Sequence, residues 1–424
     1  MDFFMDLIVN KLSKVDTRLD APSSKSYTHR AVIIASLANG ESRLYNPLIS
    51  EDILSSINTS KEFGADIEFR DNFLVVNGGN LTNPNKELDL ANSGTSLRFF
   101  TSISALFEGE TTLKGDSSLM QRPMKDLIDA LTELNVDIKS DNGKPPIIVK
   151  GGLTGGTTHI KGNVSSQYIS SLLITAPLTT NGININIKGD LISQSYINLT
   201  IDIMDKFGVK VHKKDKYYKV EPQKYSPADY YIEGDYSSAS YLLAIPAAVP
   251  GKITINNLFK NSKQGDKLIL EILDKMGLIL EIEDEQVTVT SPKGELNGIS
   301  IDLSNAPDLL PTVAVLGALA QGETRIYGVE HARFKETDRI ETCYQELQKI
   351  GVNTEQKRDG LIIRGGINPG NLEITSHNDH RLAMAFSLIG LKHGIKINNG
   401  DAYNISYPDF LETIQKTGAS IHLK

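Results

Sequence analysis

The sequence predicts an α/β protein of two domains, each built from three modules of βαβαββ connectivity. A glycine recurs every 69 to 73 residues where an apolar helical pattern meets a strand pattern, at Gly40, Gly109, Gly182, Gly251, Gly322 and Gly394. A second turn residue follows each glycine after 24 to 29 residues, at Gly64, Asn135, Gly208, Gly277, Gly351 and Gly418. Both residue types accept the left-handed conformation that ends many helices. A period of this length indicates a small α/β unit and not one turn of a solenoid.

The elements inside each module follow a fixed order. An apolar helical stretch runs into the first glycine and a short alternating strand, and a polar loop, an amphipathic helix, the second turn and more strand follow. The segments SINTSKEFGADIEF, LEILDKMGLILEI and LETIQKTGASIHL show the amphipathic helix, its turn and the next strand in three of the modules. Because the first helices are apolar on most sides, we expect them to be buried.

The two ends of the chain indicate how the modules are grouped. The sixth module stops after ASIHLK without its last strand, whereas LIVNKL, within the first dozen residues, is a strand pattern with no module of its own. We therefore expect the N-terminal strand to complete the sixth module. The stretch EPQKYSPADYYIEGDYSS is loop-like and contains two prolines. These features predict one domain of residues 23–232 and a discontinuous domain of residues 1–22 with 233–424.

Composition excludes several classes of protein. The chain has 424 residues, of which 40% are hydrophobic and 23% charged, so it is globular and long enough for more than one core. Its net charge of -8 argues against a nucleic-acid or anionic-membrane surface. We find no apolar run long enough for a membrane span and no signal peptide. The lone Cys343 suits a reducing compartment, so we expect a cytoplasmic protein.

Polar residues open the predicted buried helices in five modules. Ser26 and Arg30 precede one apolar run, and Gly94 and Arg98 precede the next. Helix N-termini carry unpaired N–H groups and a partial positive charge, so several of them together favour an anion. The same segments carry cations: Lys25, Arg30, Arg98, Arg122, Lys335, Arg339 and Arg381. Taken together, they predict a site for phosphate or carboxylate groups.

Each of these residues alone has an ordinary interpretation. A serine or aspartate at a helix start is usually a cap worth about 1 kcal/mol, and a single arginine there is usually a surface residue. Their recurrence at corresponding positions favours a site. His377 and His380 have no accompanying acid or cysteine cluster at a familiar spacing, so the sequence predicts no metal site.

The segment FKETDRIETCYQEL, residues 334–347, concentrates charge before an apolar helical pattern. On one continuous helix, Glu336 lies in line with Ile340, Cys343 and Leu347, so a carboxylate begins the stripe that faces the core. Either this carboxylate caps the helix with Arg339 as its partner, or it lines a site. Cys343 is expected to be a buried small hydrophobe.

The motifs together resemble those of the 5-enolpyruvylshikimate-3-phosphate (EPSP) synthase family. They are APSSKSYTHRA, ANSGTSLRF, QRPMKDLIDAL, VSSQYISSLLITAPL, EGDYSSASY, KETDR and NDHRLAMAF, in this order across nearly the whole chain. The resemblance implies the two-domain enolpyruvyl transferase fold, an inside-out α/β barrel with buried parallel helices and an active site in the cleft between domains. It also implies a monomer without metal or organic cofactor. The implied reaction transfers the enolpyruvyl group of phosphoenolpyruvate to the 5-hydroxyl of shikimate 3-phosphate, releasing phosphate, in chorismate and aromatic amino acid biosynthesis.

The resemblance also implies roles for particular residues. The shikimate 3-phosphate ligands are Lys25, Ser26, Arg30, Ser165, Ser166, Gln167, Ser193, Tyr196, Asp308 and Lys335. The phosphoenolpyruvate ligands are Lys25, Gly94, Arg122, Gln167, Arg339 and Arg381. Addition followed by elimination needs two placed acid/base groups. Asp308 is the candidate at the hydroxyl and Glu336 the candidate at the methylene carbon, with Lys25 assisting.

Two positions depart from the family pattern. Ile405 stands where a lysine is frequent, two residues before the aromatic–proline pair, which puts one phosphoenolpyruvate contact in doubt. His331 stands where an asparagine contact to shikimate 3-phosphate is common, so it is not assigned to the site.

Three other functions are compatible with parts of the pattern. UDP-N-acetylglucosamine enolpyruvyl transferases share architecture and donor but place a cysteine on a mobile loop, whereas Cys343 lies in a predicted helix. A non-enzymatic scaffold of six modules gives no reason for cations at the starts of buried helices. An inactive family member is disfavoured by the presence of both Asp308 and Glu336.

Overall fold

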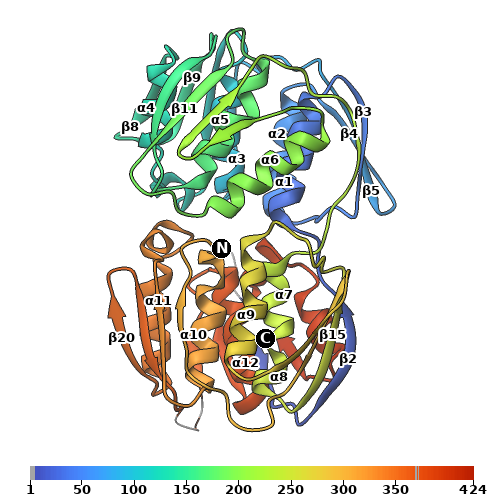
Figure 1. Ribbon diagram of the computed structural model, residues 1–424, viewed down its shortest axis with the longest axis vertical. Helices are drawn as coiled ribbons and strands as arrows, with labels where there is room; N and C mark the ends of the chain where they lie inside the picture. Colours follow the sequence, from blue (N-terminus) through green and yellow to red (C-terminus); the bar gives the residue numbers. More distant parts are fainter. Residues whose placement is uncertain (1–4, 368–369, 371) are drawn as a thin grey trace. The chain divides into compact units, whose positions relative to one another are not determined.

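The computed structural model describes residues 5–367, 370 and 372–424. The chain forms two compact units, shown in Figure 1. The continuous unit contains residues 23–232, and the discontinuous unit contains residues 1–22 and 233–424.

The continuous unit has three four-stranded sheets among its described residues. In each sheet the first two strands are parallel, and the remaining neighbours are antiparallel. In spatial order the strands are β14 (Asp229–Tyr231), β3 (Gly40–Tyr45), β5 (Phe73–Gly78) and β4 (Asp66–Arg70); β6 (Glu87–Asp89), β7 (Glu110–Lys114), β9 (Lys144–Lys150) and β8 (Ile138–Asp141); and β10 (Gly156–Lys161), β11 (Ile183–Lys188), β13 (Tyr217–Val220) and β12 (His212–Lys214).

The discontinuous unit repeats this sheet topology three times in the part that the structure describes. Its strands, in spatial order, are β2 (Val15–Asp20), β15 (Gly251–Asn256), β17 (Gln286–Thr290) and β16 (Ile279–Ile282); β18 (Ser300–Asp302), β19 (Glu323–Tyr327), β21 (Gly360–Arg364) and β20 (Asn353–Lys357); and β22 (Glu373–Thr375), β23 (Ile395–Asn398), β1 (Leu7–Val9) and β24 (Ile421–Leu423).

Strands from distant parts of the chain complete three of these sheets. Leu7 of β1 pairs with Ile397 of β23 on one side and Leu423 of β24 on the other, which confirms that the N-terminal strand completes the sixth module. Strand β2 lies parallel to β15, so residues 15–20 supply the first strand of the fourth module. Strand β14 lies parallel to β3 and likewise completes the first module.

Strand β14 corrects one expectation. The stretch 221–238 was expected to be loop, but it contains this strand and the first residues of α7 (Tyr236–Leu243). A strand of three residues is too short to show an alternating pattern, and the prolines Pro222 and Pro227 suggest a loop. β14 lies at the edge of its sheet, where prolines next to a strand are tolerated.

The first helix of each module is buried, as expected. In the continuous unit α1 (Lys25–Leu37), α3 (Gly94–Ser104) and α5 (Ser166–Thr175) are buried along nearly their whole length, whereas α2 (Glu51–Glu62), α4 (Lys125–Glu133) and α6 (Gln194–Lys206) expose one side. Two short 3-10 helices, η1 (Leu119–Gln121) and η2 (Ala176–Leu178), lie in the connections.

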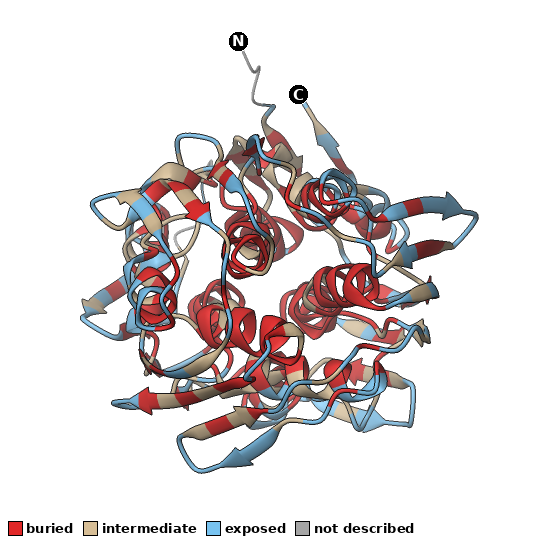
Figure 2. Cartoon of the chain, turned by 90° about the horizontal axis from the view of Figure 1, so that it is seen from above, coloured by how far each residue is buried: buried red, intermediate tan, exposed pale blue. Residues whose placement is uncertain are grey.

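The helices of the discontinuous unit are likewise divided into buried and partly exposed ones. Helices α7, α8 (Ile245–Ala248), α10 (Leu310–Leu319) and α12 (His380–His393) are largely buried, and α9 (Ile269–Lys275), α11 (Arg339–Lys349) and α13 (Phe410–Gln415) are partly exposed. The 3-10 helices are η3 (Gly265–Leu268), η4 (Pro307–Leu309), η5 (Glu330–Phe334) and η6 (Gly400–Ile405). Figure 2 shows the buried helices nearly end-on, with strands outside them.

The turn residues of the repeat all have a backbone conformation that favours glycine or asparagine. All twelve glycine and asparagine positions of the repeat have positive φ, from Gly182 at 65° to Gly251 at 139°. At Gly251 a side chain is also excluded by space, because a Cβ atom would lie 1.7 Å from the carbonyl oxygen of Val15 on β2. The glycine thus permits the close approach of the strand that completes the fourth module.

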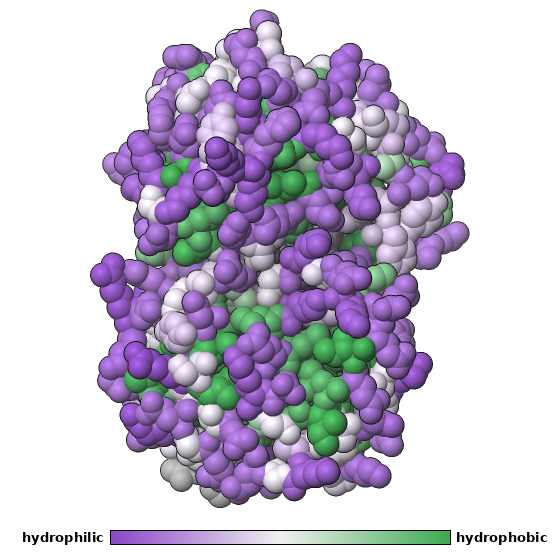
Figure 3. Space-filling view, in the orientation of Figure 1, coloured by the Kyte–Doolittle hydropathy of each residue, from purple (hydrophilic) through white to green (hydrophobic). Residues whose placement is uncertain are grey.

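Polar side chains cover most of the surface drawn in Figure 3, with apolar groups in smaller areas between them. Each unit has its own hydrophobic core beneath its sheets. Among the described residues, no helix combines the length and the apolar character that crossing a bilayer requires.

Candidate active site

Side-chain hydrogen bonds join four helices inside the continuous unit. Arg30 Nε of α1 donates a hydrogen bond to Thr200 Oγ1 of α6 at 2.7 Å, and Thr200 Oγ1 lies 2.8 Å from Ser170 Oγ of α5. Gln167 Nε2 of α5 donates to Thr95 Oγ1 of α3 at 3.0 Å. These bonds join the first halves of α1, α3, α5 and α6. The structure therefore joins the three first helices that the sequence selected in this unit, α1, α3 and α5, and adds α6 to them.

Arg30 is a buried cation with few partners. Its residue is 2% exposed, and Nη1 donates to the carbonyl oxygen of Ser26 at 3.0 Å. Its guanidinium carbon lies 5.2 Å from the centre of the Phe99 ring. Nη2 is buried and has no hydrogen-bond partner among the described residues. Burial lowers the pKa of Arg30 to about 10. A charge in this environment favours an anionic ligand.

Two further guanidinium groups border Gly94. A Cβ atom at Gly94 would lie 2.1 Å from Arg98 Nη1 and 2.6 Å from Arg122 Nη1. Both arginines are less than 8% exposed, and Arg122 Nη2 donates to Asn92 Oδ1. Two cations this close to one backbone segment make a second position that favours an anion. We call Lys25, Arg30, Arg98 and Arg122 the basic cluster.

The other predicted residues of this unit lie at element starts. Lys25 is the first residue of α1, and its Nζ lies 2.8 Å from Asp52 Oδ2. Ser165 caps α5 by accepting a hydrogen bond from Gln167 N, and Ser166 follows it, buried. Ser193 precedes α6 in the left-handed conformation, with φ of 51°, and Tyr196 lies in the first turn of that helix.

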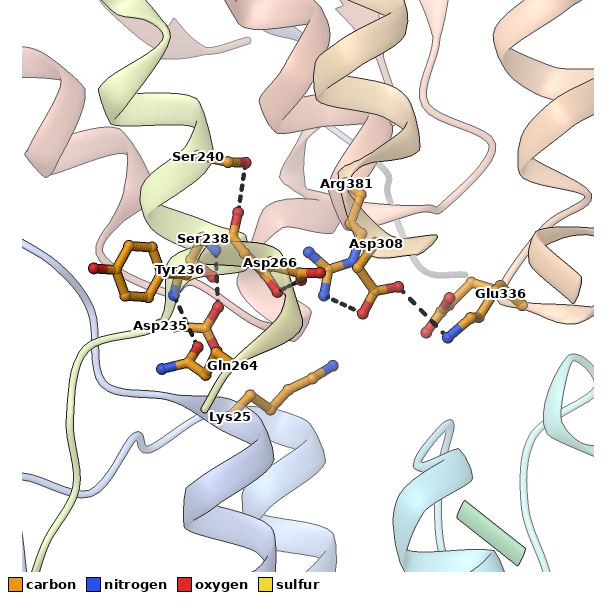
Figure 4. Close-up of polar contacts among 12 residues, drawn as sticks. Lys25, Asp235, Tyr236, Ser238, Ser240, Gln264, Asp266, Asp308, Glu336 and Arg381 are labelled. Carbon is orange, nitrogen blue, oxygen red and sulfur yellow. Dashed lines mark hydrogen bonds and ion pairs between the residues drawn. The ribbon is translucent and has the colours of Figure 1, made fainter. Parts of the chain in front are cut away.

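In the discontinuous unit, six charged residues form the carboxylate–guanidinium cluster. They are Asp308, Lys335, Glu336, Arg339, Asp379 and Arg381, of which Figure 4 labels Asp308, Glu336 and Arg381. Asp308 accepts from Arg339 Nη1 at 2.8 Å and from Arg381 Nη2 at 2.9 Å, and Lys335 Nζ lies 3.5 Å away. Asp308 is thus the anion that three cations share.

Arg339 holds the carboxylates of the cluster in place. Its side chain is 1% exposed and contacts Asp308, Glu336 Oε2 at 2.5 Å and Asp379 Oδ2 at 2.7 Å. Burial alone lowers the pKa of a guanidinium, but the charges of Asp379, Glu336 and Asp308 more than offset it, so the pKa of Arg339 is raised. The arginine is therefore a permanent cation that fixes the two candidate acid/base groups relative to each other.

The structure corrects the expected position of Glu336. It does not lie on the helix: η5 ends at Phe334, and α11 begins at Arg339 with Asp338 as its N-cap. Asp338 Oδ1 accepts from Glu341 N at 3.0 Å, so the cap is filled by a residue other than Glu336. The predicted continuous stripe from Glu336 is wrong, and its apolar part starts with Ile340. Cys343 is 0% exposed, which confirms its expected burial.

Sequence reasoning missed several contacts of these clusters. Asp379 caps α12 by accepting from Arg381 N at 2.9 Å, a role that its place before the helix could have indicated. Tyr241 Oη lies 3.4 Å from Arg381 Nη1, and no local pattern marks Tyr241 or the Thr200 partner of Arg30. The structure also shows the two residues that depart from the family pattern. Ile405 is the last residue of η6. His331 is buried on η5, and its burial lowers its pKa to about 4.

Within the described residues, no group of three or more histidine, cysteine or acidic side chains has a geometry that could hold a metal ion. Both clusters consist of groups that bind anions or move protons.

Comparison with known proteins identifies the family of this chain. Residues 9–414 match the family described as EPSP synthase (3-phosphoshikimate 1-carboxyvinyltransferase). The chain belongs to this family. It is 51% identical over 422 residues to the 3-phosphoshikimate 1-carboxyvinyltransferase of Methanothermobacter thermautotrophicus, covering 99% of this chain and 100% of the relative. It is 50% identical over 441 residues to the protein of that name from Methanobrevibacter smithii, covering 99% and 100%.

Solved structures agree on the fold of this EPSP synthase family member. An EPSP synthase structure from Acinetobacter baumannii matches with a TM-score of 0.84 at 24% identity, covering 99% of this chain and 100% of that one. The expected fold class is confirmed. As an EPSP synthase family member, the chain is a transferase of the shikimate pathway, which leads to aromatic amino acids.

Proposed function

We propose that this chain transfers the enolpyruvyl group of phosphoenolpyruvate to the 5-hydroxyl of shikimate 3-phosphate through the two clusters described above. The observation that carries this proposal is the buried Arg30, a cation with no carboxylate ion pair among the described residues, at the meeting point of α1, α5 and α6. Both substrates are phosphorylated carboxylates, so they supply the charge that this environment favours.

The basic cluster is proposed to bind the anionic groups. Arg30 and its neighbours at the starts of α1, α5 and α6 would hold shikimate 3-phosphate, through Lys25, Ser26, Ser165, Ser166, Gln167, Ser193 and Tyr196. Gly94 and Arg122 would hold phosphoenolpyruvate, because the absence of a side chain at Gly94 leaves the guanidinium groups of Arg98 and Arg122 close to the start of α3. Arg98 borders the same glycine and supports this assignment.

The carboxylate–guanidinium cluster is proposed to do the proton chemistry. Asp308 is assigned to the 5-hydroxyl proton and Glu336 to the methylene carbon, with Lys25 assisting. Arg339 and Arg381 are assigned to phosphoenolpyruvate and Lys335 to shikimate 3-phosphate. Because Arg339 contacts both carboxylates, one guanidinium keeps the proton acceptor and the proton donor in a fixed relation.

The two clusters are proposed to serve one pair of substrates, in a cleft to which each unit contributes. This proposal follows from the reaction, because a bond between the two substrates forms only where their binding groups act together. We also propose a monomeric cytoplasmic enzyme, since one chain carries both clusters and its single cysteine is a free, buried thiol.

Phosphate release measured by a coupled assay tests the reaction. We expect release only when shikimate 3-phosphate and phosphoenolpyruvate are both present, and none when UDP-N-acetylglucosamine replaces shikimate 3-phosphate. Cys343→Ala should keep its turnover, because the thiol is buried inside α11 and burial raises its pKa. Release that depends on UDP-N-acetylglucosamine and is abolished by Cys343→Ala would reject the proposal. A monomer mass by light scattering checks the proposed assembly.

A further inference from the structure

Asp266 is a buried acid that neither the sequence nor the proposed reaction accounts for. It lies on η3 of the discontinuous unit and is 2% exposed. One carboxyl oxygen, Oδ2, accepts a hydrogen bond from Ser237 Oγ, and the other, Oδ1, is buried with no hydrogen-bond partner among the described residues. A carboxylate usually has several donors when it is buried. Asp266 therefore lacks the contacts that stabilise a buried charge.

The start of α7 provides few hydrogen-bond donors to Asp266. Asp235 caps this helix by accepting from Ser238 N at 2.8 Å, and Gln264, next to η3, accepts from Tyr236 N at 2.9 Å. Figure 4 shows these groups on one side of Asp266, with Arg381 and Asp308 on the other. Two N–H groups at the helix start are thus already used by other acceptors.

The charged groups around Asp266 are Asp235 from α7, Asp308 from η4 and Arg381 from α12. The charged residues of the adjoining α9, which are Glu271, Asp274 and Lys275, are exposed. Arg381 is the one cation in this set, and it already contacts Asp308 at 2.9 Å. Asp308 also has Arg339 and Lys335 as partners, whereas Arg381 is the one cation in the set around Asp266. Because an ionised Asp266 would have to share Arg381 with Asp308, and because Asp266 is the least solvated of the three carboxyl groups, it is the one expected to keep its proton.

The direction in which the pKa of Asp266 is shifted agrees with this geometry. Burial, followed by the charge of Asp308, raises the pKa of Asp266 to about 7. Arg381 and the Ser237 hydroxyl act in the opposite direction and do not offset these two effects.

We infer that Asp266 is a positioning residue for the transfer reaction, which acts through Arg381 and Asp308 and holds a proton while the site works. When Asp266 is protonated, Arg381 keeps its charge available for Asp308 and for an incoming anion. When Asp266 loses its proton, a second buried carboxylate competes for Arg381, and an anionic substrate binds less well. This inference rests on the proposed function, in which Arg381 binds phosphoenolpyruvate.

Asp266→Asn tests the inference, because asparagine has the same shape, still accepts from Ser237 and cannot ionise. At pH 6 we expect the KM for phosphoenolpyruvate to be within about twofold of the original chain. As the pH rises to 8.5, KM should increase at least fivefold in the original chain and stay nearly constant in the variant. Titration of the substrate itself affects both proteins equally, so the difference between the two curves isolates Asp266. Parallel curves overturn the inference. Asp274→Asn, on the exposed face of α9, is the matched control and should follow the original chain.

A second measurement needs no turnover. Infrared difference spectra of the substrate-free chain between pH 6 and pH 8.5 should contain a carboxylic-acid carbonyl band that is absent from Asp266→Asn. Absence of this band in the original chain overturns the inference. If Asp266→Asn does not fold, Ser237→Ala replaces it: loss of the hydroxyl removes a donor to the ionised form, so the band and the rise in KM should move to higher pH. If the band and the rise in KM occur at the same or a lower pH in Ser237→Ala than in the original chain, the inference is also overturned.

Failure of the proposed function gives a different result. A chain that releases no phosphate from the two substrates but shows the Asp266 band rejects the proposed reaction and confirms the protonated carboxyl. The affinity for phosphoenolpyruvate, measured by calorimetry across the same pH range, then takes the place of KM. A constant affinity in the original chain overturns the positioning role.

Discussion

Arg339 Nη2 lies 2.5 Å from Glu336 Oε2, and the same guanidinium contacts Asp308 Oδ1 at 2.8 Å. One buried arginine thus bridges the two carboxylates to which proton transfer is assigned. Since Glu336 precedes α11 and does not cap it, its carboxylate is available for chemistry without loss of the helix cap. This separation of roles gives the first prediction.

Glu336→Gln should retain affinity for shikimate 3-phosphate within a few fold while turnover falls by about 10²-fold or more. Glutamine keeps the shape and can accept from Arg339, but it cannot deliver or take a proton. Phosphate release and calorimetry measure the two effects. Glu330→Gln is a matched control on η5, because Glu330 is paired with Arg358 at the surface. Near-normal turnover of Glu336→Gln would remove this residue from the catalytic assignment.

Arg30→Lys should weaken binding of shikimate 3-phosphate by at least about tenfold. Lysine keeps the charge but loses the fork that contacts Thr200 and the Ser26 carbonyl, and it leaves Thr200 without that donor. Calorimetry with shikimate 3-phosphate measures the affinity, and a thermal melt reports folding. Arg43→Lys, at a half-exposed position on β3, should bind normally. Equal affinity of all three proteins contradicts the role of Arg30.

Gly94→Ala should raise the KM for phosphoenolpyruvate several-fold and leave the affinity for shikimate 3-phosphate nearly unchanged. The new methyl group must displace the Nη1 atoms of Arg98 and Arg122, which would lie 2.1 Å and 2.6 Å from it. Because these are the ends of long side chains, the protein should still fold. Gly294→Ala, where nothing lies within 4 Å, is the control. The assignment of Gly94 fails if its substitution affects both substrates equally.

Glu346 should make the discontinuous unit sensitive to acid. Its side chain is fully buried and accepts from His377 Nε2 at 2.6 Å, Lys349 Nζ at 2.7 Å and Thr375 N at 3.0 Å. Burial raises its pKa, but these hydrogen bonds more than offset burial, so its pKa is lowered in the folded chain. A lowered pKa stabilises the fold above the unfolded pKa of about 4.3, and the stabilisation is lost as the pH falls through the folded value.

Glu346→Gln should therefore cost about 1–3 kcal/mol at pH 7, and the difference from the original chain should shrink below about pH 4. Thermal melts across this pH range measure the effect. Glu355→Gln changes an exposed carboxylate on β20 and should leave the melting temperature unchanged. A constant difference between Glu346→Gln and the original chain at all pH values would show that burial, and not charge, accounts for the loss.

The fold could be predicted from the sequence to the extent that its signals were long or repeated. Six helix-to-strand glycines, each with a positive φ, marked the modules. The N-terminal strand was predictable because the sixth module lacked one. Strand β14 was not, since three residues carry no measurable period and its parallel partner β3 lies far away in the sequence. Pairing of this kind depends on tertiary structure alone.

The candidate site was predictable where side chains stand at helix starts. The position of Glu336 was predicted wrongly, although Asp338 and Glu341 form the aspartate-to-glutamate spacing that marks a helix start. The apolar stripe was given more weight than this cap. Asp266 had no local signal at all, because its surroundings come from α7, η4 and α12. A buried acid of this kind becomes visible only when distant segments are packed.

The pairing of β1 between β23 and β24 has a consequence for synthesis on the ribosome. The strand at residues 7–9 is made well before either of its partners, which both lie after residue 394. Strand β2 likewise cannot pair with β15 until β15 has been made. Residues 23–232 contain every strand of their own three sheets and can reach their final structure while the rest of the chain is still being made. Strands β1 and β2 are thus made before residues 23–232 but can complete their sheets only after them.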